Sequence, residues 1–150
     1  MNEHVQVILK VLLAGITGTF IMTFFVNAFS KISGDDFNVP AILSKLFRLK
    51  NAVYQLWLGR LTHYAIGIGF STVLVYLWES DLSKPTFINV LVSGLIMGCI
   101  AVTVWRSMMF LAGFVLVHKK TLFLSLIFTG HIVFAFTAWF VWAYFPYGLS

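Results

Sequence analysis

Four long apolar stretches, separated by charged and turn-forming residues, constrain the fold of this chain more than any other feature. They cover residues 11–30, 53–78, 86–105 and 122–145, and none of them contains Asp, Glu or Lys. A helix that crosses a bilayer needs about 20 mostly apolar residues. Because a backbone in lipid must satisfy its own hydrogen bonds, each stretch is predicted to be a membrane-spanning helix.

The composition also indicates that lipid, and not water, surrounds much of the chain. Of the 150 residues, 60% are apolar and 10% are charged, whereas soluble proteins carry about 25% charged residues. A water-soluble domain of ~150 residues leaves about 30% of its unfolded-chain surface exposed, so it could not bury so much apolar surface. We therefore predict one all-α, four-helix transmembrane domain over residues 1–150, which excludes a soluble enzyme. The single cysteine excludes an intramolecular disulfide.

The distribution of basic residues predicts the orientation. If the spans alternate in direction, one side of the membrane holds only Lys10 and Lys84, and the other side holds the remaining basic residues, which are Lys31, Lys45, Arg48, Lys50, Arg60, Arg106, Lys119 and Lys120. Loops rich in Lys and Arg stay in the cytoplasm, so both termini are expected outside. Beside apolar spans, this basic excess favours anionic membrane lipids as partners, and not nucleic acid.

Two segments between the spans need a separate interpretation. After Asn38, a plausible cap, and Pro40, which suits a first helical turn, the chain predicts a short amphipathic helix. This helix could lie flat at the cytoplasmic interface or pack against the ends of the bundle. The apolar segment 107–117 is too short to span, and it either extends the third helix or turns along the interface.

The spans show a weak internal repeat. The second and fourth share the pattern His-x3-small-x8-Tyr, which begins at His63 and His131. The first and third share small-x3-small-x4-Thr, which begins at Ala14 and Gly94. These patterns predict two helix pairs related by a two-fold axis along the membrane normal, a known way of building membrane folds.

Small residues four positions apart predict where helices approach closely. Ala14 and Gly18 form such a pair in the first span, and Gly94 and Gly98 form one in the third. In lipid, small residues let helix backbones pack tightly. The contact is expected inside one bundle, or alternatively with a second copy or another membrane protein.

His63 and His131 are the candidate binding residues, because an ionisable side chain within a span marks a functional site by default. Each has a small residue four positions later, Gly67 and Ala135 respectively, on the same helical face. At matched depth, the two imidazoles could hold the iron of haem b as metal ligands, with room for the porphyrin. Alternatively, they pin the bundle through hydrogen bonds, or bind a quinone or another ligand.

Two arginines would complete a haem site. Arg60 and Arg106 lie near the expected cytoplasmic ends of their spans and could pair with the haem propionates. The simpler interpretation is that both side chains extend to the lipid headgroups.

A resemblance covers most of the chain. Residues 14–23 (AGITGTFIMT), the segment 38–40 (NVP), the stretch 59–69 and the pair 130–131 (GH) carry it. They resemble uncharacterised families of small bacterial four-helix inner-membrane proteins, domains of unknown function with a glycine-rich first span and Gly-His phrases in later spans. The resemblance implies a four-helix fold in a bacterial inner membrane, with the outer termini in the periplasm. It implies no chemistry.

The sequence lacks a catalytic set. No span holds a carboxylate, and no phosphate loop or zinc-protease motif is present. The leading hypothesis is a small non-enzymatic subunit or scaffold that packs against other membrane proteins or against itself. The alternatives are a bis-histidine haem b electron-transfer protein and a carrier of a lipid, a quinone or another small molecule.

Overall fold

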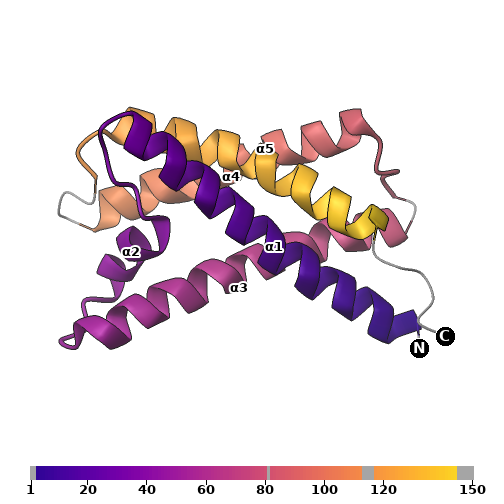
Figure 1. Cartoon of the computed structure of the whole chain (residues 1–150), viewed down its shortest axis with the longest axis horizontal. Helices are drawn as coiled ribbons and strands as arrows, with labels where there is room; N and C mark the ends of the chain where they lie inside the picture. The colour runs from indigo at the N-terminus through magenta and orange to yellow at the C-terminus, as the bar shows by residue number, and fades with distance from the viewer. Residues whose placement is uncertain (1–2, 81, 113–116, 145–150) are drawn as a thin grey trace.

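The computed structural model describes residues 3–80, 82–112 and 117–144 (Figure 1). Within them, the four longest helices are α1 (Glu3–Ile32), α3 (Ala52–Glu79), α4 (Phe87–Leu111) and α5 (Lys120–Tyr144). All four are long and apolar enough to cross a membrane. This confirms the predicted all-α fold with four candidate spans.

The predicted short helix in the first connection is also present. It is α2 (Val39–Ser44), followed by the 3-10 turn η1 (Lys45–Phe47). Asn38 caps it as expected, because its side-chain oxygen accepts a hydrogen bond from the Ala41 amide at 3.2 Å. The sequence allowed this helix to lie flat at the interface or to pack against the end of the bundle. The structure shows the second arrangement, since Val39 and Leu43 are buried. Gly59 of α3 permits this packing, because a Cβ there would collide with the Pro40 carbonyl of α2.

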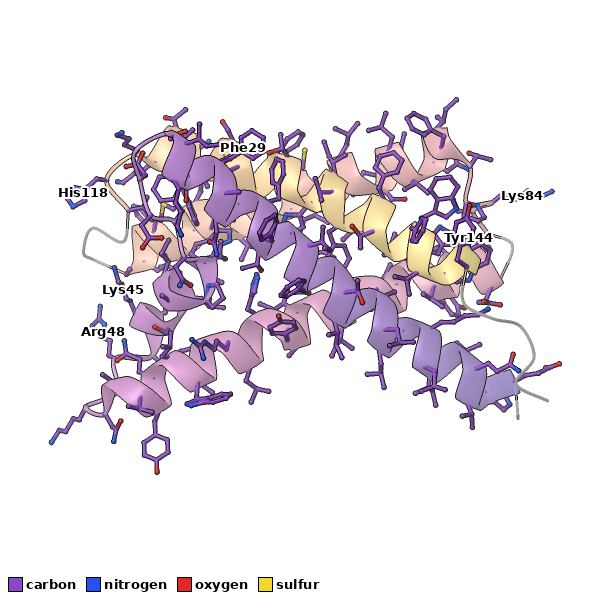
Figure 2. All side chains as sticks on the ribbon, in the orientation of Figure 1. Phe29, Lys45, Arg48, Lys84, His118 and Tyr144 are labelled. Carbon is purple, nitrogen blue, oxygen red and sulfur yellow. The ribbon has the colours of Figure 1, made fainter. Side chains whose placement is uncertain are left out.

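The end of the bundle that carries α2 also carries most of the basic side chains. Figure 2 shows Lys45, Arg48 and His118 at this end and Lys84 and Tyr144 at the other. Residues 107–111 continue α4 as helix, and 113–116 lie outside the described part of the chain. Arg48 donates a hydrogen bond to the carbonyl of Ala112, so the first and third connections are joined.

The helices are not packed symmetrically. α1 packs against both α3 and α5, and α5 packs against α4, which gives the order α3–α1–α5–α4. Within the described helices, α3 and α4 make almost no contact. A two-fold axis relating the pairs α1–α3 and α4–α5 would make the α1–α5 and α3–α4 contacts equivalent. The two contacts are unequal, so the bundle is closed on one side and open on the other.

The predicted small residues lie where helices approach most closely. Ala14 is fully buried. A Cβ at Gly18 would lie 2.8 Å from the Phe134 ring of α5, and one at Gly94 would lie 2.8 Å from the Ile132 Cα of α5. A Cβ at Gly98 would meet another aromatic side chain of α5, at 2.8 Å. α5 is therefore the helix against which both α1 and α4 pack.

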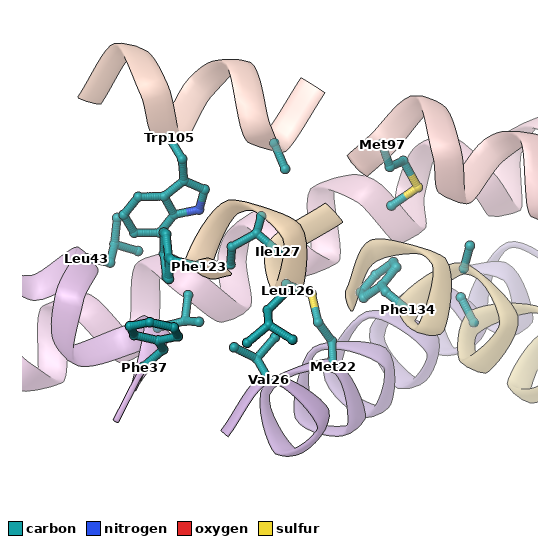
Figure 3. Close-up of a cluster of buried hydrophobic side chains, with 14 of the residues drawn as sticks. Met22, Val26, Phe37, Leu43, Met97, Trp105, Phe123, Leu126, Ile127 and Phe134 are labelled. Atoms are coloured by element: carbon teal, nitrogen blue, oxygen red, sulfur yellow. The ribbon is translucent and has the colours of Figure 1, made fainter. Parts of the chain in front are cut away.

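An aromatic and aliphatic core fills the α2 end of the bundle (Figure 3). The Phe123 ring of α5 is fully buried. It contacts the ring of Trp105 at a centroid distance of 5.0 Å and that of Phe37 at 5.5 Å, both edge-on. Met22 and Val26 of α1 complete this core from the opposite side (Figure 3).

Candidate functional site

A cavity of about 270 Å³ lies between α3 and α4, and we call it the central cavity. α1 and α5 also contribute lining residues, and Val39 and Leu43 of α2 line it as well. Thr19, His63 and His131 are polar lining residues, Trp105 adds an indole N–H, and the other lining residues are apolar side chains or glycine. The two predicted histidines therefore line one common space, although they belong to helices that barely touch.

His63 on α3 is hydrogen-bonded to α1. Its Nε2 lies 2.9 Å from the hydroxyl oxygen of Thr23. That hydroxyl lies 2.7 Å from the carbonyl oxygen of Thr19, to which it donates its only hydrogen. Thr23 must therefore accept a hydrogen bond from His63, so Nε2 carries the imidazole hydrogen and Nδ1 is unprotonated.

His131 on α5 is hydrogen-bonded within its own helix. Its Nδ1 lies 2.8 Å from the carbonyl oxygen of Ile127, and a carbonyl can only accept. Nδ1 therefore carries the hydrogen of the neutral imidazole, and Nε2, on the far side of the ring, is unprotonated. The Phe70 ring of α3 packs edge-on against this imidazole at a centroid distance of 5.5 Å.

The central cavity opens toward the bilayer. Ile66 of α3 and Ile100 and Val104 of α4 line the cavity, yet their exposed fractions are 43%, 48% and 43%. These residues therefore form a mouth between the two helices, on the side that faces lipid. At the α2 end, Val39 and Leu43 are buried, so the cavity is covered there.

The other predicted site residues have different surroundings. Gly67 lines the cavity, but a Cβ there would collide with the Thr19 hydroxyl, so Gly67 mainly permits the approach of α3 to α1. Ala135 is buried against Gly94 between α4 and α5, and it is not a lining residue. The structure thus brings His63, His131 and Gly67 together, and separates Ala135 from them.

Neither arginine lines the central cavity. Arg60 is exposed, its guanidinium lies 5.6 Å from the centroid of the Trp57 ring, and it borders a separate groove between α1 and α3. Arg106 borders a groove between α4 and α5 on the outer face of the bundle. Neither side chain is therefore placed to pair with a group bound between the histidines.

A haem fits this geometry poorly. Pockets for drug-sized ligands measure roughly 300–1,000 Å³, and the central cavity, at about 270 Å³, suits one or two rings better than a porphyrin. Nε2 of His63 is already used in the bond to Thr23.

The surroundings of the histidines could not be predicted from the sequence. Phe70 and Trp105 line the cavity and Thr23 bonds to His63, but each follows the ordinary pattern of an apolar span. The polarity of Thr23 was visible, whereas its pairing with a histidine 40 residues away depends on how α1 crosses α3.

Comparisons of the chain with protein-family models, with curated proteins and with solved structures find no match. A function for this chain is therefore argued from the central cavity and its two histidines.

Proposed function

We propose that the protein is a non-enzymatic membrane protein that binds or carries a small apolar molecule, which enters the central cavity from the bilayer between α3 and α4. The observation that carries this proposal is the cavity itself, which holds two buried imidazoles and opens toward lipid. Ligand sites in helical membrane proteins are commonly built between helices from apolar walls and a few polar groups.

The energetics of an empty cavity support an occupant. An unfilled cavity forfeits packing contacts, and because this one opens toward lipid, an acyl chain is the occupant to compare with. A lipid tail could fill the space, but it would leave the polar atoms of His63 and His131 without partners. A ligand that fills the cavity and also meets these atoms removes both costs.

Native mass spectrometry of the protein, extracted into a mild detergent, tests the proposal. We expect a bound apolar molecule on the wild-type protein. The variant Ala101→Phe places a ring into the cavity from α4 and should release the molecule, whereas Ala65→Phe adds the same ring on an exposed position of α3 and should retain it. Equal occupancy in both variants, or no bound molecule in the wild type, would contradict the proposal.

A second candidate is a subunit of a larger membrane assembly. A groove between α4 and α5 on the outer face is lined by exposed polar residues that face the expected bilayer, namely Cys99, Thr103, Arg106, Lys120, Thr121, Ser125 and Thr129. Small polar residues on a lipid-facing surface are typical of contacts between transmembrane helices. A bifunctional thiol-to-amine reagent at Cys99, applied in native membranes, should yield one discrete adduct, which Cys99→Ser removes. Unmodified monomer alone would reject this candidate.

We further propose that the α2 end faces the cytoplasm of a bacterial cell. The opposite end, where α1 begins and α5 ends, then faces the periplasm. The excess of basic residues at the α2 end supports this orientation. Cysteines introduced at Lys45 and Lys84, in a Cys99→Ser background, provide the test. In intact spheroplasts, an impermeant maleimide should label Lys84→Cys and spare Lys45→Cys, and the reverse pattern would overturn the orientation.

A further inference from the structure

Three of the polar groups that line the central cavity have used their hydrogens within the protein, and Trp105, which also lines it, carries an indole N–H donor. The Thr19 hydroxyl donates to the Gly15 carbonyl at 2.7 Å. The Nε2 hydrogen of His63 is donated to Thr23, and the Nδ1 hydrogen of His131 is donated to Ile127. What Thr19, His63 and His131 can still offer to a ligand is therefore lone pairs only, whereas Trp105 offers a hydrogen.

The unprotonated ring nitrogens, Nδ1 of His63 and Nε2 of His131, have no hydrogen-bond partner among the described side chains and backbone atoms. Both belong to buried rings that line the cavity. An acceptor without a donor costs free energy where little water is available to replace the donor, as at this depth of a membrane.

We infer that the ligand of the central cavity is a hydrogen-bond donor: an apolar molecule that carries a hydroxyl group, such as a phenol, a hydroquinol or a long-chain alcohol. This inference rests on the proposed function. A ligand with acceptors only, such as a quinone, an ester or an ether, could accept from the Trp105 indole but would leave both imidazole acceptors without a donor.

The charge and shape of the cavity lining restrict the class of ligand further. A cation would also satisfy the two acceptors, but none of the described lining residues is acidic, and an uncompensated charge within the membrane is costly. The rings of Phe70, Trp105 and Phe134 line the same space, which suits a flat head group. The lipid-facing mouth at Ile66 and Ile100 lets an alkyl tail remain in the bilayer.

A matched pair of compounds tests the inference. Binding of 4-heptylphenol and of its methyl ether, 4-heptylanisole, is measured by equilibrium titration of the protein in lipid nanodiscs. In the ether a methyl group replaces the hydroxyl hydrogen and the donor is lost, so we expect the phenol to bind about tenfold tighter, the effect of one hydrogen bond. The alcohol 1-decanol is the third probe. Tighter binding of 1-decanol than of the phenol indicates a lipid alcohol as the ligand, and weaker binding indicates a phenolic head group.

His131→Phe assigns the preference to the imidazole, because it keeps an aromatic ring and removes the acceptor. The preference for the phenol over the ether should decrease in this variant, where only the acceptor of His63 remains, and persist unchanged in His118→Phe, which changes an exposed histidine at the end of the bundle. If His131→Phe does not fold, ¹⁵N spectra of histidine-labelled wild-type protein replace it. The unprotonated Nε2 resonance of His131 should then shift on addition of the phenol and stay in place with the ether.

The outcomes are distinguishable. If the ether binds as tightly as the phenol, the donor inference is overturned and the proposed binding function stands. If neither hydroxyl compound nor the ether binds, the inference falls together with the proposed function.

Discussion

The ammonium nitrogen of Lys10 lies 2.6 Å from the carboxylate oxygen Oε1 of Glu79, although the two residues are 69 positions apart. Lys10 is 2% exposed, which is unusual for a lysine in an apolar helix. The indole nitrogen of Trp142 donates to the same carboxylate oxygen at 2.8 Å, and the ammonium lies 5.5 Å from the centroid of the Trp142 ring. One carboxylate thus joins α1, α3 and α5 at the end of the bundle opposite α2.

Removing one partner of this pair should destabilise the protein more than replacing both. Glu79→Gln removes this carboxylate charge from the buried ammonium, and we expect a loss of about 1–3 kcal/mol in the free energy of unfolding, since Glu79 itself is partly exposed. The double variant Lys10→Met/Glu79→Leu should recover most of that loss. Unfolding in mixed micelles with increasing sodium dodecyl sulfate measures both. A double variant less stable than Glu79→Gln would contradict this account.

The close approach of α1 and α3 depends on Gly67. A Cβ at this position would overlap the Thr19 hydroxyl, so Gly67→Ala should separate the two helices and destabilise the protein by about 1–3 kcal/mol. Gly69→Ala is the matched control on the same helix, because its Cβ would meet no atom within 4 Å. The control should leave stability unchanged or raise it by up to about 1 kcal/mol through helix propensity. Equal effects of the two substitutions on micelle unfolding would argue against a tight contact.

Thr23 positions His63 through one hydrogen bond. Thr23→Val keeps the shape of the side chain and removes the oxygen that accepts the Nε2 hydrogen, so a buried donor is left unpaired at a cost of about 1–3 kcal/mol. We expect lower stability and a changed ¹⁵N spectrum of the His63 ring. Thr72→Val is the control, since the hydroxyl of this exposed threonine bonds only to the Ile68 carbonyl of its own helix. An unchanged His63 spectrum in Thr23→Val would disprove the assigned tautomer.

Features determined by local sequence were predictable. The spans follow from runs of apolar residues, and α2 follows from the cap at Asn38 and the proline at its start. The matched depth of His63 and His131 rests on their equal distance from the starts of their spans, and both do line one cavity.

Contacts between helices could not be predicted in the same way. A single-helix pattern does not specify which face of α1 meets α3, so the Thr23–His63 bond and the Lys10–Glu79 pair were not visible in the sequence. The predicted repeat also suggested equivalent helix pairs, whereas the unequal α1–α5 and α3–α4 contacts create the open side on which the cavity lies.

A direct spectroscopic test separates the proposed ligand class from the haem hypothesis. A bis-histidine haem would need Nε2 of His63 released from Thr23, a larger space than about 270 Å³, and basic partners that Arg60 and Arg106 do not supply. Titration of the purified protein with haemin should therefore give no Soret band that depends on these histidines. A band that forms with wild-type protein and disappears in both His63→Ala and His131→Ala would contradict this expectation, because it would require the cavity to expand and the Thr23 bond to break. Binding of the alkylphenol should instead weaken when the acceptor of His131 is removed, and it requires no iron.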